Sequence, residues 1–498
     1  MRYFSLFVLC LLASLGGRWQ PLAAQSPEPS AIEPLVRVVD LDVGESSKVT
    51  LCDGSQATLK LVSLDEQRDK VRLAVRRAKL VLEVNGQRVE LEAAPYRLPI
   101  TAAGVQLDCS VTAGMNSNGT PEFWGLEKDA RLRVWPADSP WITPGSFIYP
   151  LKQGWLATRT WFDNQAVDGG ATILKKIYYH SGLDIGASEG LVEVIAATDA
   201  LVVQRGTDVL EGHQQDTPAS PRYDVVYLLD GRGWYYRYSH LKEIAPDILP
   251  GRVIRQGELV GLVGKEGASG GWSHLHFEIK SRQPSGKWGT QAGFAFLHQA
   301  YVEEFGLKMY ALARPSHFLV AGEAAELDGS RSWTASGEPL QYEWTLHDGT
   351  KRAGAKTTVT YPTPGYWCET LQVTNAAGES DYDFVEVMVL DPGDLQHYTP
   401  SLNLNFHPSR DIQVEDEITF KVRSFRMVGG EESWDFGDGS PAQTTRSPEE
   451  AEPLAADGYA QLTHRYKKPG QYIVTVSRTH DNGQTATSKL CVTVEAKQ

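Results

Sequence analysis

The sequence predicts a mainly β, multidomain protein with an N-terminal β module, a second β region and two immunoglobulin-like β-sandwich repeats. Three observations lead to this prediction. The chain has 498 residues, enough for roughly three or four domains. Short runs of β-branched and aliphatic residues, separated by turn signals, recur along most of the chain. The C-terminal third contains an internal repeat.

The first 24 residues have the pattern of a secretory signal peptide. Arg2 supplies a positive charge, residues 4–15 form an apolar run, and residues 22–24 (LAA) form a small-residue exit. The apolar run is too short to anchor the chain in a bilayer. We therefore expect an exported, soluble protein in the periplasm, at the cell surface or outside the cell. Residues 25–35 follow as a proline-rich, polar linker.

The sequence pattern of residues 36–140 predicts an all-β module of unknown role. Its apolar runs are VRVVDLDV, KVTLC, ATLKLV, KLVLEV and RLRVW, separated by turns such as DGS and NGQ. No cluster of reactive residues lies here, so the module could dock, occlude or simply support its neighbour. Cys52 and Cys109 could pair in an oxidising compartment. We expect Cys368 and Cys491 to be buried small residues.

The boundary PWITPG separates this module from a second β region, residues 145–305. Its predicted strands are LVEVIAA, ALVVQR, YDVVYLLD, WYYRYSHL, ELVGLVG and HLHFEIK. Only the stretch after Gly289, TQAGFAFLHQAYVEEFGL, is expected to hold a helix.

Residues 310–392 and 398–498 form the internal repeat. The first copy contains YEWTLHDGT, YPTPGYW and LQVTNAAGES, and the second contains SWDFGDGS, YKKPGQY and VTVSRTHDNGQ in the same order. The second copy also carries an insertion, SPEEAEPLAADG. Both copies resemble PKD repeats, which implies immunoglobulin-like sandwiches. The first is degenerate at Leu346 and His347. We interpret Asp435 and Asp438 as turn residues rather than calcium ligands.

Two histidines alternate with apolar residues in the segment HLHFEIK. Successive side chains of a strand point to opposite faces, so His274, His276 and Glu278 share one face. The apolar residues between them share the other face and are expected in the core. The polar face indicates a ligand, a metal or simply contact with water.

Two further segments of the same region contain histidine or aspartate residues that could lie beside this face. His180 and Asp184 are four residues apart, which keeps them on one face if the segment is extended, and His240 ends an aromatic strand. Imidazole and carboxylate groups are ligands that zinc accepts, and a catalytic zinc site keeps one position open. The residues alone leave open whether they form a metal site or a set of hydrogen-bonded histidines.

Three motifs in this region resemble the lysostaphin/LytM-type zinc endopeptidases of bacterial cell walls. They are HSGLDIGA, YSHL and GASGGWSHLHFEI, and the connecting stretches VEVIAATDALVV and VIRQGELVGLVG also fit the family pattern. The similarity extends over residues 149–280. It implies an antiparallel β core with a groove, one zinc ion, and hydrolysis of peptide bonds in peptidoglycan stem or cross-bridge peptides.

The resemblance also assigns roles to the five residues. It implies that His180, Asp184 and His276 are zinc ligands and that His240 and His274 are catalytic histidines that do not bind the metal. The strand pattern by itself does not separate His274 from His276.

The chain departs from the family before the first histidine. The expected F-G-x-R lead-in is replaced by WLATRTWFDNQAVDGGATILKK, and Tyr178 and Tyr179 are both candidates for a tyrosine that some members place there. The substrate therefore stays open. So do two alternatives: a non-catalytic regulator, although such relatives have typically lost zinc ligands that this chain keeps, and an adhesive protein with a vestigial peptidase.

The formal net charge of −14 argues against a nucleic-acid partner. We expect the repeats to contact cell-surface polysaccharide or protein. As spacers or adhesion modules, they should be dispensable for hydrolysis of a small soluble peptide.

Overall fold

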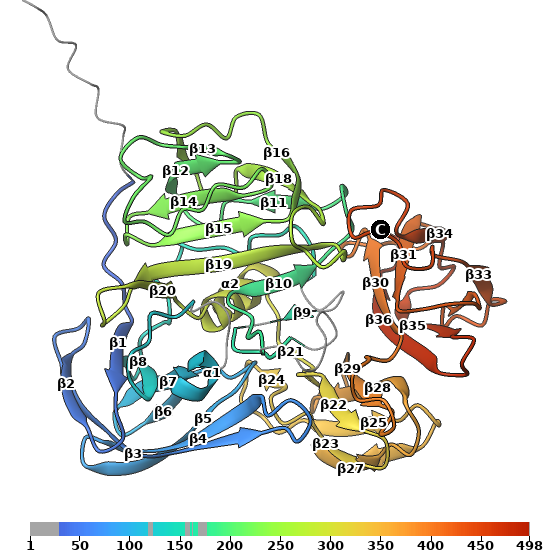
Figure 1. Cartoon of the computed structure of the whole chain (residues 1–498), viewed down its shortest axis with the longest axis horizontal. Helices are drawn as coiled ribbons and strands as arrows, with labels where there is room; N and C mark the ends of the chain where they lie inside the picture. Colours follow the sequence, from blue (N-terminus) through green and yellow to red (C-terminus); the bar gives the residue numbers. More distant parts are fainter. Residues whose placement is uncertain (1–28, 118–122, 155–159, 162, 168–176, 498) are drawn as a thin grey trace, which may run out of the picture.

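The computed structural model describes residues 29–117, 123–154, 160–161, 163–167 and 177–497. Strands dominate these residues (Figure 1). The expected signal peptide and most of the segment 155–176 lie outside the described residues. Within the described part of the chain, no helix is long and apolar enough to cross a membrane.

The N-terminal module contains two antiparallel sheets, as the sequence predicts. Its elements are β1 (Arg37–Leu41), β2 (Ser46–Thr50), β3 (Gln56–Arg68), β4 (Val75–Val84), β5 (Gln87–Ala93), β6 (Ile100–Ala102), β7 (Val105–Thr112), α1 (Ala113–Ser117) and β8 (Ala130–Pro136). One sheet has the order β1-β8-β7-β6 and the other β2-β3-β4-β5. Alternate residues of β4, Leu80, Leu82 and Val84, are buried in the core that both sheets share.

The suggested pairing of Cys52 with Cys109 is wrong. Cys52 follows β2 in one sheet and Cys109 lies in β7 of the other, and both are free thiols. Cys368 is buried and Cys491 half-buried, and both are likewise free.

The middle region, residues 145–305, contains a nine-stranded sheet and a three-stranded sheet. Its elements are β9 (Thr160–Trp161), β10 (Leu183–Gly186), β11 (Glu193–Ile195), β12 (Ala200–Arg205), β13 (Asp208–Val209), β14 (Val226–Asp230), β15 (Tyr235–Ser239), β16 (Leu241–Ile244), β17 (Val253–Ile254), β18 (Leu259–Val263), β19 (His274–Arg282), β20 (Trp288–Thr290) and α2 (Phe294–Phe305). The large sheet has the order β13-β12-β14-β15-β19-β10-β9. Its strands pair antiparallel, and α2 lies where the only helix of this region was expected.

β19 holds the alternating segment singled out in the sequence. Leu275, Phe277 and Ile279 are almost fully buried and belong to the main core of the middle region. The opposite face of the strand therefore carries His274, His276 and Glu278, as the alternation predicts.

The two C-terminal repeats are β-sandwiches. The first consists of β21 (Met309–Tyr310), β22 (His317–Val320), β23 (Ala324–Asp328), β24 (Trp333–Thr334), β25 (Gln341–Thr345), β26 (Lys351–Ala353), β27 (Lys356–Thr360), β28 (Gly365–Thr374) and β29 (Ser380–Leu390). The second consists of β30 (Ser401–His407), β31 (Ile418–Phe425), β32 (Glu432–Asp435), β33 (Gln443–Thr445), β34 (Ala460–His464), β35 (Gly470–Thr479) and β36 (Thr485–Val494). Equivalent tryptophans, Trp344 and Trp434, are fully buried in the two cores. β28 pairs with β36, so one sheet continues through both repeats.

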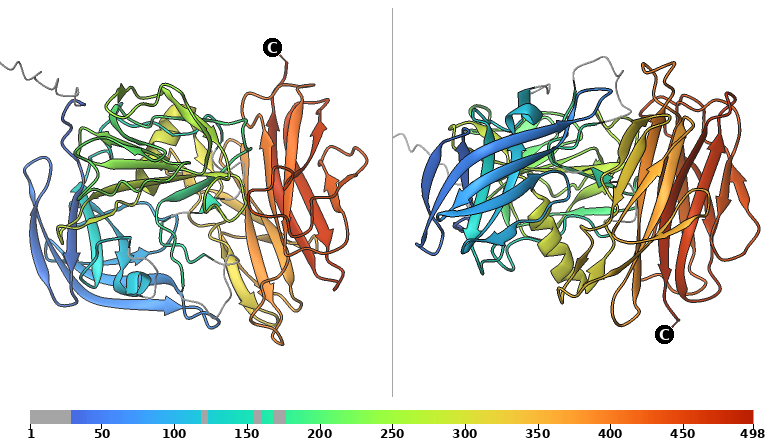
Figure 2. Two further views of the ribbon diagram at one scale, coloured as in Figure 1. Left: turned by 45° about the horizontal axis from the view of Figure 1, so that its top comes forward. Right: turned by 90° about the horizontal axis from the view of Figure 1, so that it is seen from below.

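The repeats pack against the other two parts of the molecule (Figures 1 and 2). The first repeat meets the N-terminal module, where Lys70 Nζ lies 3.5 Å from Glu323 Oε1 and Arg76 lies over the ring of Phe318. In the second repeat, β30 and β31 lie beside the ends of β10 and β19. This last contact places an immunoglobulin-like sheet next to the histidine-bearing strand.

Candidate metal centre and groove

The floor of the site is the antiparallel pair β10 and β19. Asp184 lies directly opposite His276, and Gly186 lies opposite His274. This register brings together two motifs that are about ninety positions apart in the sequence, through ordinary ladder pairing.

His180 reaches the same place by a bend rather than by an extended strand. Gly182 has φ +83°, and a Cβ on it would lie 2.8 Å from Phe277 O and 2.9 Å from Glu278 Cβ. Only glycine tolerates both this conformation and this close approach. The segment from His180 to Asp184 is therefore not extended throughout, although the two side chains do meet.

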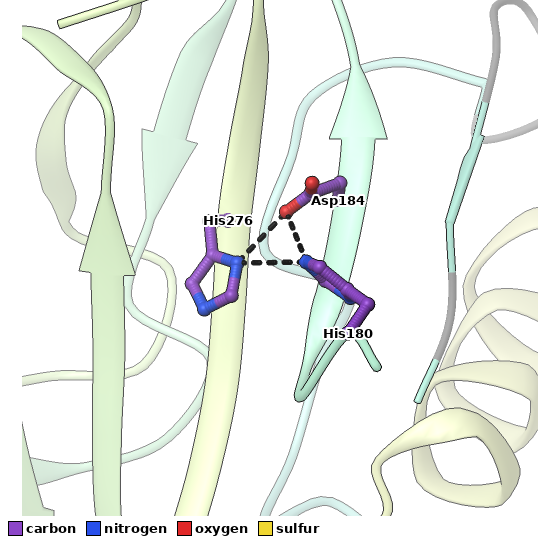
Figure 3. Close-up of side chains that lie close together, drawn as sticks. All are labelled: His180, Asp184 and His276. Atoms are coloured by element: carbon purple, nitrogen blue, oxygen red, sulfur yellow. Dashed lines mark hydrogen bonds and ion pairs between the residues drawn. The ribbon is translucent and has the colours of Figure 1, made fainter. Parts of the chain in front are cut away.

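Two imidazole nitrogens and one carboxylate oxygen lie close together on this pair of strands (Figure 3). His180 Nε2 lies 3.0 Å from Asp184 Oδ1, His276 Nδ1 lies 2.8 Å from the same oxygen, and the two nitrogens are 3.2 Å apart. Ligands of a tetrahedral zinc ion are about 3.3 Å from one another, which follows from its bond lengths of about 2.0–2.1 Å. Among the described residues, this is the one cluster of His, Cys, Asp and Glu that could hold a metal ion. The donor set and its spacing fit zinc.

The surroundings of the cluster favour metal binding. His180 Nδ1 donates to Gly182 O at 3.1 Å, which leaves the lone pair of Nε2 directed at the other two side chains. Burial opposes ionisation of Asp184, but its contacts with the imidazoles of His180 and His274 hold the pKa of its carboxyl well below the usual value. Asp184 is therefore a charged carboxylate in a nearly buried position, a group that zinc accepts as a ligand.

Glu278 lies behind His276 and is fully buried. Its Oε2 is 3.8 Å from His276 Nε2, and its Oε1 accepts from Thr290 Oγ1 at 2.9 Å and lies 3.0 Å from Lys280 Nζ. At 3.8 Å this is a contact between the carboxylate and the imidazole without a hydrogen bond, on the side of His276 that points away from Asp184. The alternation in β19 places Glu278 on this face, but the sequence alone did not assign it a role.

His240 and His274 lie beside the cluster, with ring centroids 4.6 Å apart. His240 has φ +66°, a conformation that is costly outside glycine and that is typical of functional sites. Its backbone N–H donates to Asp224 Oδ2 at 2.9 Å, and its Nδ1 donates to Glu266 O at 2.6 Å. Burial lowers the pKa of His240 to about 3, and neighbouring histidines add to this effect. The ring is held neutral, with Nε2 as its available nitrogen.

His274 is held by the residue two positions before it. Trp272 stacks on its ring with centroids 3.9 Å apart and planes at 19°, and Nδ1 donates to Trp272 O at 3.0 Å. His274 Nε2 lies 3.3 Å from Asp184 Oδ2, the oxygen that does not face the cluster of three. The two histidines of β19 thus have different neighbours. His276 Nδ1 faces His180 and Asp184 Oδ1, whereas His274 lies beside His240 and directs Nε2 at Asp184 Oδ2.

A cavity of about 420 Å³ opens over these groups. All five predicted site residues line it, together with Tyr178. Tyr178 lies edge-on to His180, whereas the Tyr179 hydroxyl accepts from Val75 N–H in the N-terminal module. Of the two candidate tyrosines, Tyr178 is therefore the one at the groove.

Other parts of the chain complete the lining of this cavity. Phe123 comes from the N-terminal module, and Met388 comes from the first repeat. The second repeat contributes Ser401, Asn403, Phe425 and Arg426. These positions carried no signal in the sequence, because only the packing of whole domains brings them to the groove.

Family models match three segments of the chain. Peptidase family M23 matches residues 178–287, and the PKD domain matches residues 310–389 and 403–493. No curated protein matches this chain.

Solved structures with similar parts include two of the M23 type. The lytM protein of Ruminococcus gnavus shares 23% identity over 24% of this chain and 47% of its own, with a TM-score of 0.19. The chain thus spans about half of that relative. The catalytic domain of the prophage-encoded M23 protein EnpA of Enterococcus faecalis shares 22% identity over 26% of this chain and 86% of its own, with a TM-score of 0.19. Csd3 of Helicobacter pylori shares 12% identity over 52% of this chain and 82% of its own, with a TM-score of 0.22.

The M23 match encloses the three motifs and all five site residues, and the PKD matches fall on the two sandwiches. The expected resemblance is confirmed. The chain contains a domain of peptidase family M23, a family of hydrolases that act on peptides, followed by two PKD domains.

Proposed function

We propose that this protein is an exported zinc metalloendopeptidase that hydrolyses peptide bonds in peptidoglycan stem or cross-bridge peptides. The observation that carries the proposal is the convergence of His180 Nε2, Asp184 Oδ1 and His276 Nδ1 at one groove, inside the segment that matches peptidase family M23. An intact set of three ligands argues against a non-catalytic regulator or a vestigial enzyme.

In this proposal His180, Asp184 and His276 hold one zinc ion. Two neutral imidazoles and one carboxylate would leave the site with a net positive charge. Bound there, zinc supplies a Lewis acid that polarises a peptide carbonyl and makes a water molecule more acidic. The Glu278 carboxylate faces His276 Nε2 at 3.8 Å, and its negative charge would favour a metal-bound imidazole.

His240 and His274 perform the proton transfers. Each ring donates its Nδ1 proton to a backbone carbonyl, of Glu266 and Trp272 respectively, which leaves Nε2 as the nitrogen for proton transfer. Nε2 of His274 also lies 3.3 Å from Asp184 Oδ2. In its neutral form, such a nitrogen accepts the proton of an attacking water. Once protonated, it donates to the carbonyl oxygen on which negative charge develops or to the leaving amine.

We also propose that the chain is exported through its N-terminal signal segment and acts in the periplasm, at the cell surface or outside the cell. The PKD domains are consistent with such a location, where they would contact surface polysaccharide or protein.

The test uses the full-length, zinc-loaded protein and purified peptidoglycan. We expect new amino termini, measured by amine labelling and mass spectrometry, without new reducing sugar ends. A chelator should stop their appearance, and added zinc should restore it. New reducing ends without new amino termini, or undiminished cleavage by protein shown to be metal-free, would contradict the proposal.

A further inference from the structure

The second PKD repeat lies against the loops that follow β10 and precede β19. β30 alternates between apolar residues in the core of the repeat and two asparagines on its other face, Asn403 and Asn405. The polar face of an antiparallel sheet usually contacts water, but both asparagines are almost fully buried here. Asn405 Oδ1 accepts from Ser188 Oγ at 2.6 Å, just after β10. This face of β30 is therefore an interface with the middle region.

The insertion that distinguishes the second repeat from the first belongs to the same interface. It comprises residues 447–458. Arg423 of β31 holds it by donating to Ala451 O at 2.7 Å and to Pro453 O at 3.0 Å. A Cβ on Gly271 would lie only 3.0 Å from Pro453 Cα. The glycine-rich loop that leads into β19 is therefore in direct contact with the insertion.

Tyr459, immediately after the insertion, connects β30 to this loop. Its hydroxyl accepts from Ser273 N–H at 2.9 Å and donates to Asn403 Oδ1 at 2.9 Å. Burial raises the pKa of this hydroxyl, so it keeps the proton that it donates. Ser273 is itself almost fully buried, and a buried backbone N–H requires a partner. A side chain of the second repeat supplies that partner.

The N–H that Tyr459 holds belongs to the same peptide group as the carbonyl that holds His274. Trp272 C=O and Ser273 N–H are the two ends of one planar unit, so neither end turns without the other. Trp272 O accepts from His274 Nδ1 at 3.0 Å, and the Trp272 side chain stacks on the same ring. A hydrogen bond at the N–H also polarises the carbonyl and strengthens it as an acceptor. A continuous chain of hydrogen bonds therefore runs from the His274 ring through this peptide group and Tyr459 to Asn403.

We infer that Tyr459 is a positioning residue for His274, and that the second PKD repeat is for this reason a working part of the catalytic unit. Tyr459 does not line the cavity. It acts through the Trp272–Ser273 peptide group, whose carbonyl sets the tautomer and the orientation of the His274 ring. The inference rests on the proposed peptidase function. It departs from the expectation that the repeats are spacers dispensable for hydrolysis of a small soluble peptide.

The variant Tyr459→Phe, which removes only the hydroxyl, tests this role in the full-length, zinc-loaded protein. The substrate is a soluble peptide fragment of peptidoglycan. We expect kcat to fall about tenfold, the scale of one lost hydrogen bond to a buried group, with KM and zinc content unchanged. In a His274→Ala background, the same substitution should change the residual rate no further, because Tyr459 acts through His274.

The matched control is Ser188→Ala. It also removes a hydrogen bond between the second repeat and the middle region, but Ser188 is not part of the chain that leads to His274. Its kcat should stay close to wild type. Three outcomes would overturn the inference: an unchanged kcat for Tyr459→Phe, an equal loss in both backgrounds, or an equal loss for Ser188→Ala.

The same chain of hydrogen bonds can be observed without turnover, by nuclear magnetic resonance of protein with isotope-labelled histidine rings. The His274 signal, identified by its absence from His274→Ala, should carry its proton on Nδ1. Tyr459→Phe should move the resonance of this proton to higher field, because a weaker hydrogen bond deshields it less, and Ser188→Ala should leave it in place. An unmoved resonance in Tyr459→Phe would overturn the inference. A protein that shows the expected shift but never hydrolyses peptidoglycan contradicts only the proposed function.

Discussion

The floor and the far wall of the groove are both β-sheets, but they are assembled on different principles. The floor is one antiparallel pair, β10 and β19, whose ladder register places Asp184 opposite His276. The wall is the β30–β31 edge of an immunoglobulin-like sandwich, brought to the site by contacts such as Ser188 with Asn405. The three residues of the candidate metal cluster lie within a single fold, whereas part of the cavity lining comes from a neighbouring domain. Substitutions in the floor should therefore lower the rate more than those in the wall.

The largest of these effects is expected at His240. Its strained backbone and its bond to Glu266 O hold one ring nitrogen toward the groove. His240→Ala should lower kcat by about 10²–10⁴-fold, the usual contribution of a general acid–base group. Zinc content and melting temperature should stay close to wild type, and His213→Ala is a suitable control because that ring contacts Tyr235 outside the cavity. A His240→Ala protein with normal kcat on all peptides would contradict a catalytic role for His240.

An intermediate effect is expected at Glu278, which supports the floor from behind. Glu278→Gln keeps the shape of the side chain but removes the charge facing His276 Nε2. We expect zinc affinity or kcat to fall about 10–100-fold, as for other outer partners of ligand histidines. Competition with a chelator measures the affinity directly. If affinity and kcat both stay unchanged, Glu278 serves only the buried network with Lys280 and Thr290.

The smallest effect is expected where wall and floor touch. Gly270 and Gly271 both have positive φ, so alanine strains the backbone at either position. Only at Gly271 would the new Cβ also press on Pro453 of the second repeat, at 3.0 Å. Gly271→Ala should therefore lower kcat/KM a few-fold more than Gly270→Ala does. Equal losses for the two variants would mean that the repeat does not set the position of this loop.

The sequence predicts the floor well because its determinants are local. Alternation in HLHFEIK is enough to place His274, His276 and Glu278 on one face and to bury Leu275, Phe277 and Ile279. The alternation does not distinguish His274 from His276. The pairing of β19 with β10 does, because it places His276 opposite Asp184 and His274 opposite Gly186. The bend at Gly182 could not be predicted, because a spacing of four residues does not show whether the segment is extended.

The wall could not be predicted from the sequence. Asn403, Arg426 and Tyr459 look like ordinary residues of a sandwich, and the insertion at 447–458 looks like a surface loop. Their place beside the groove appears only when the second repeat packs against the middle region. Periodic patterns in the sequence do not predict which domain surfaces pack together. The possible pairing of Cys52 with Cys109 also depends on packing within the module: Cys52 follows β2 of one sheet, whereas Cys109 lies in β7 of the other.

The central claim is that two histidines of one strand, two residues apart, have separate tasks: His276 holds the metal and His274 acts on the substrate. The most direct test is the zinc content of purified His274→Ala and His276→Ala, measured by elemental analysis beside the rate of peptide hydrolysis. We predict about one zinc per chain and a collapsed rate for His274→Ala, and loss of both zinc and activity for His276→Ala, with His180→Ala and Asp184→Ala behaving like the latter. A His274→Ala protein without zinc, or a His276→Ala protein that keeps its zinc and still cuts, would contradict the account.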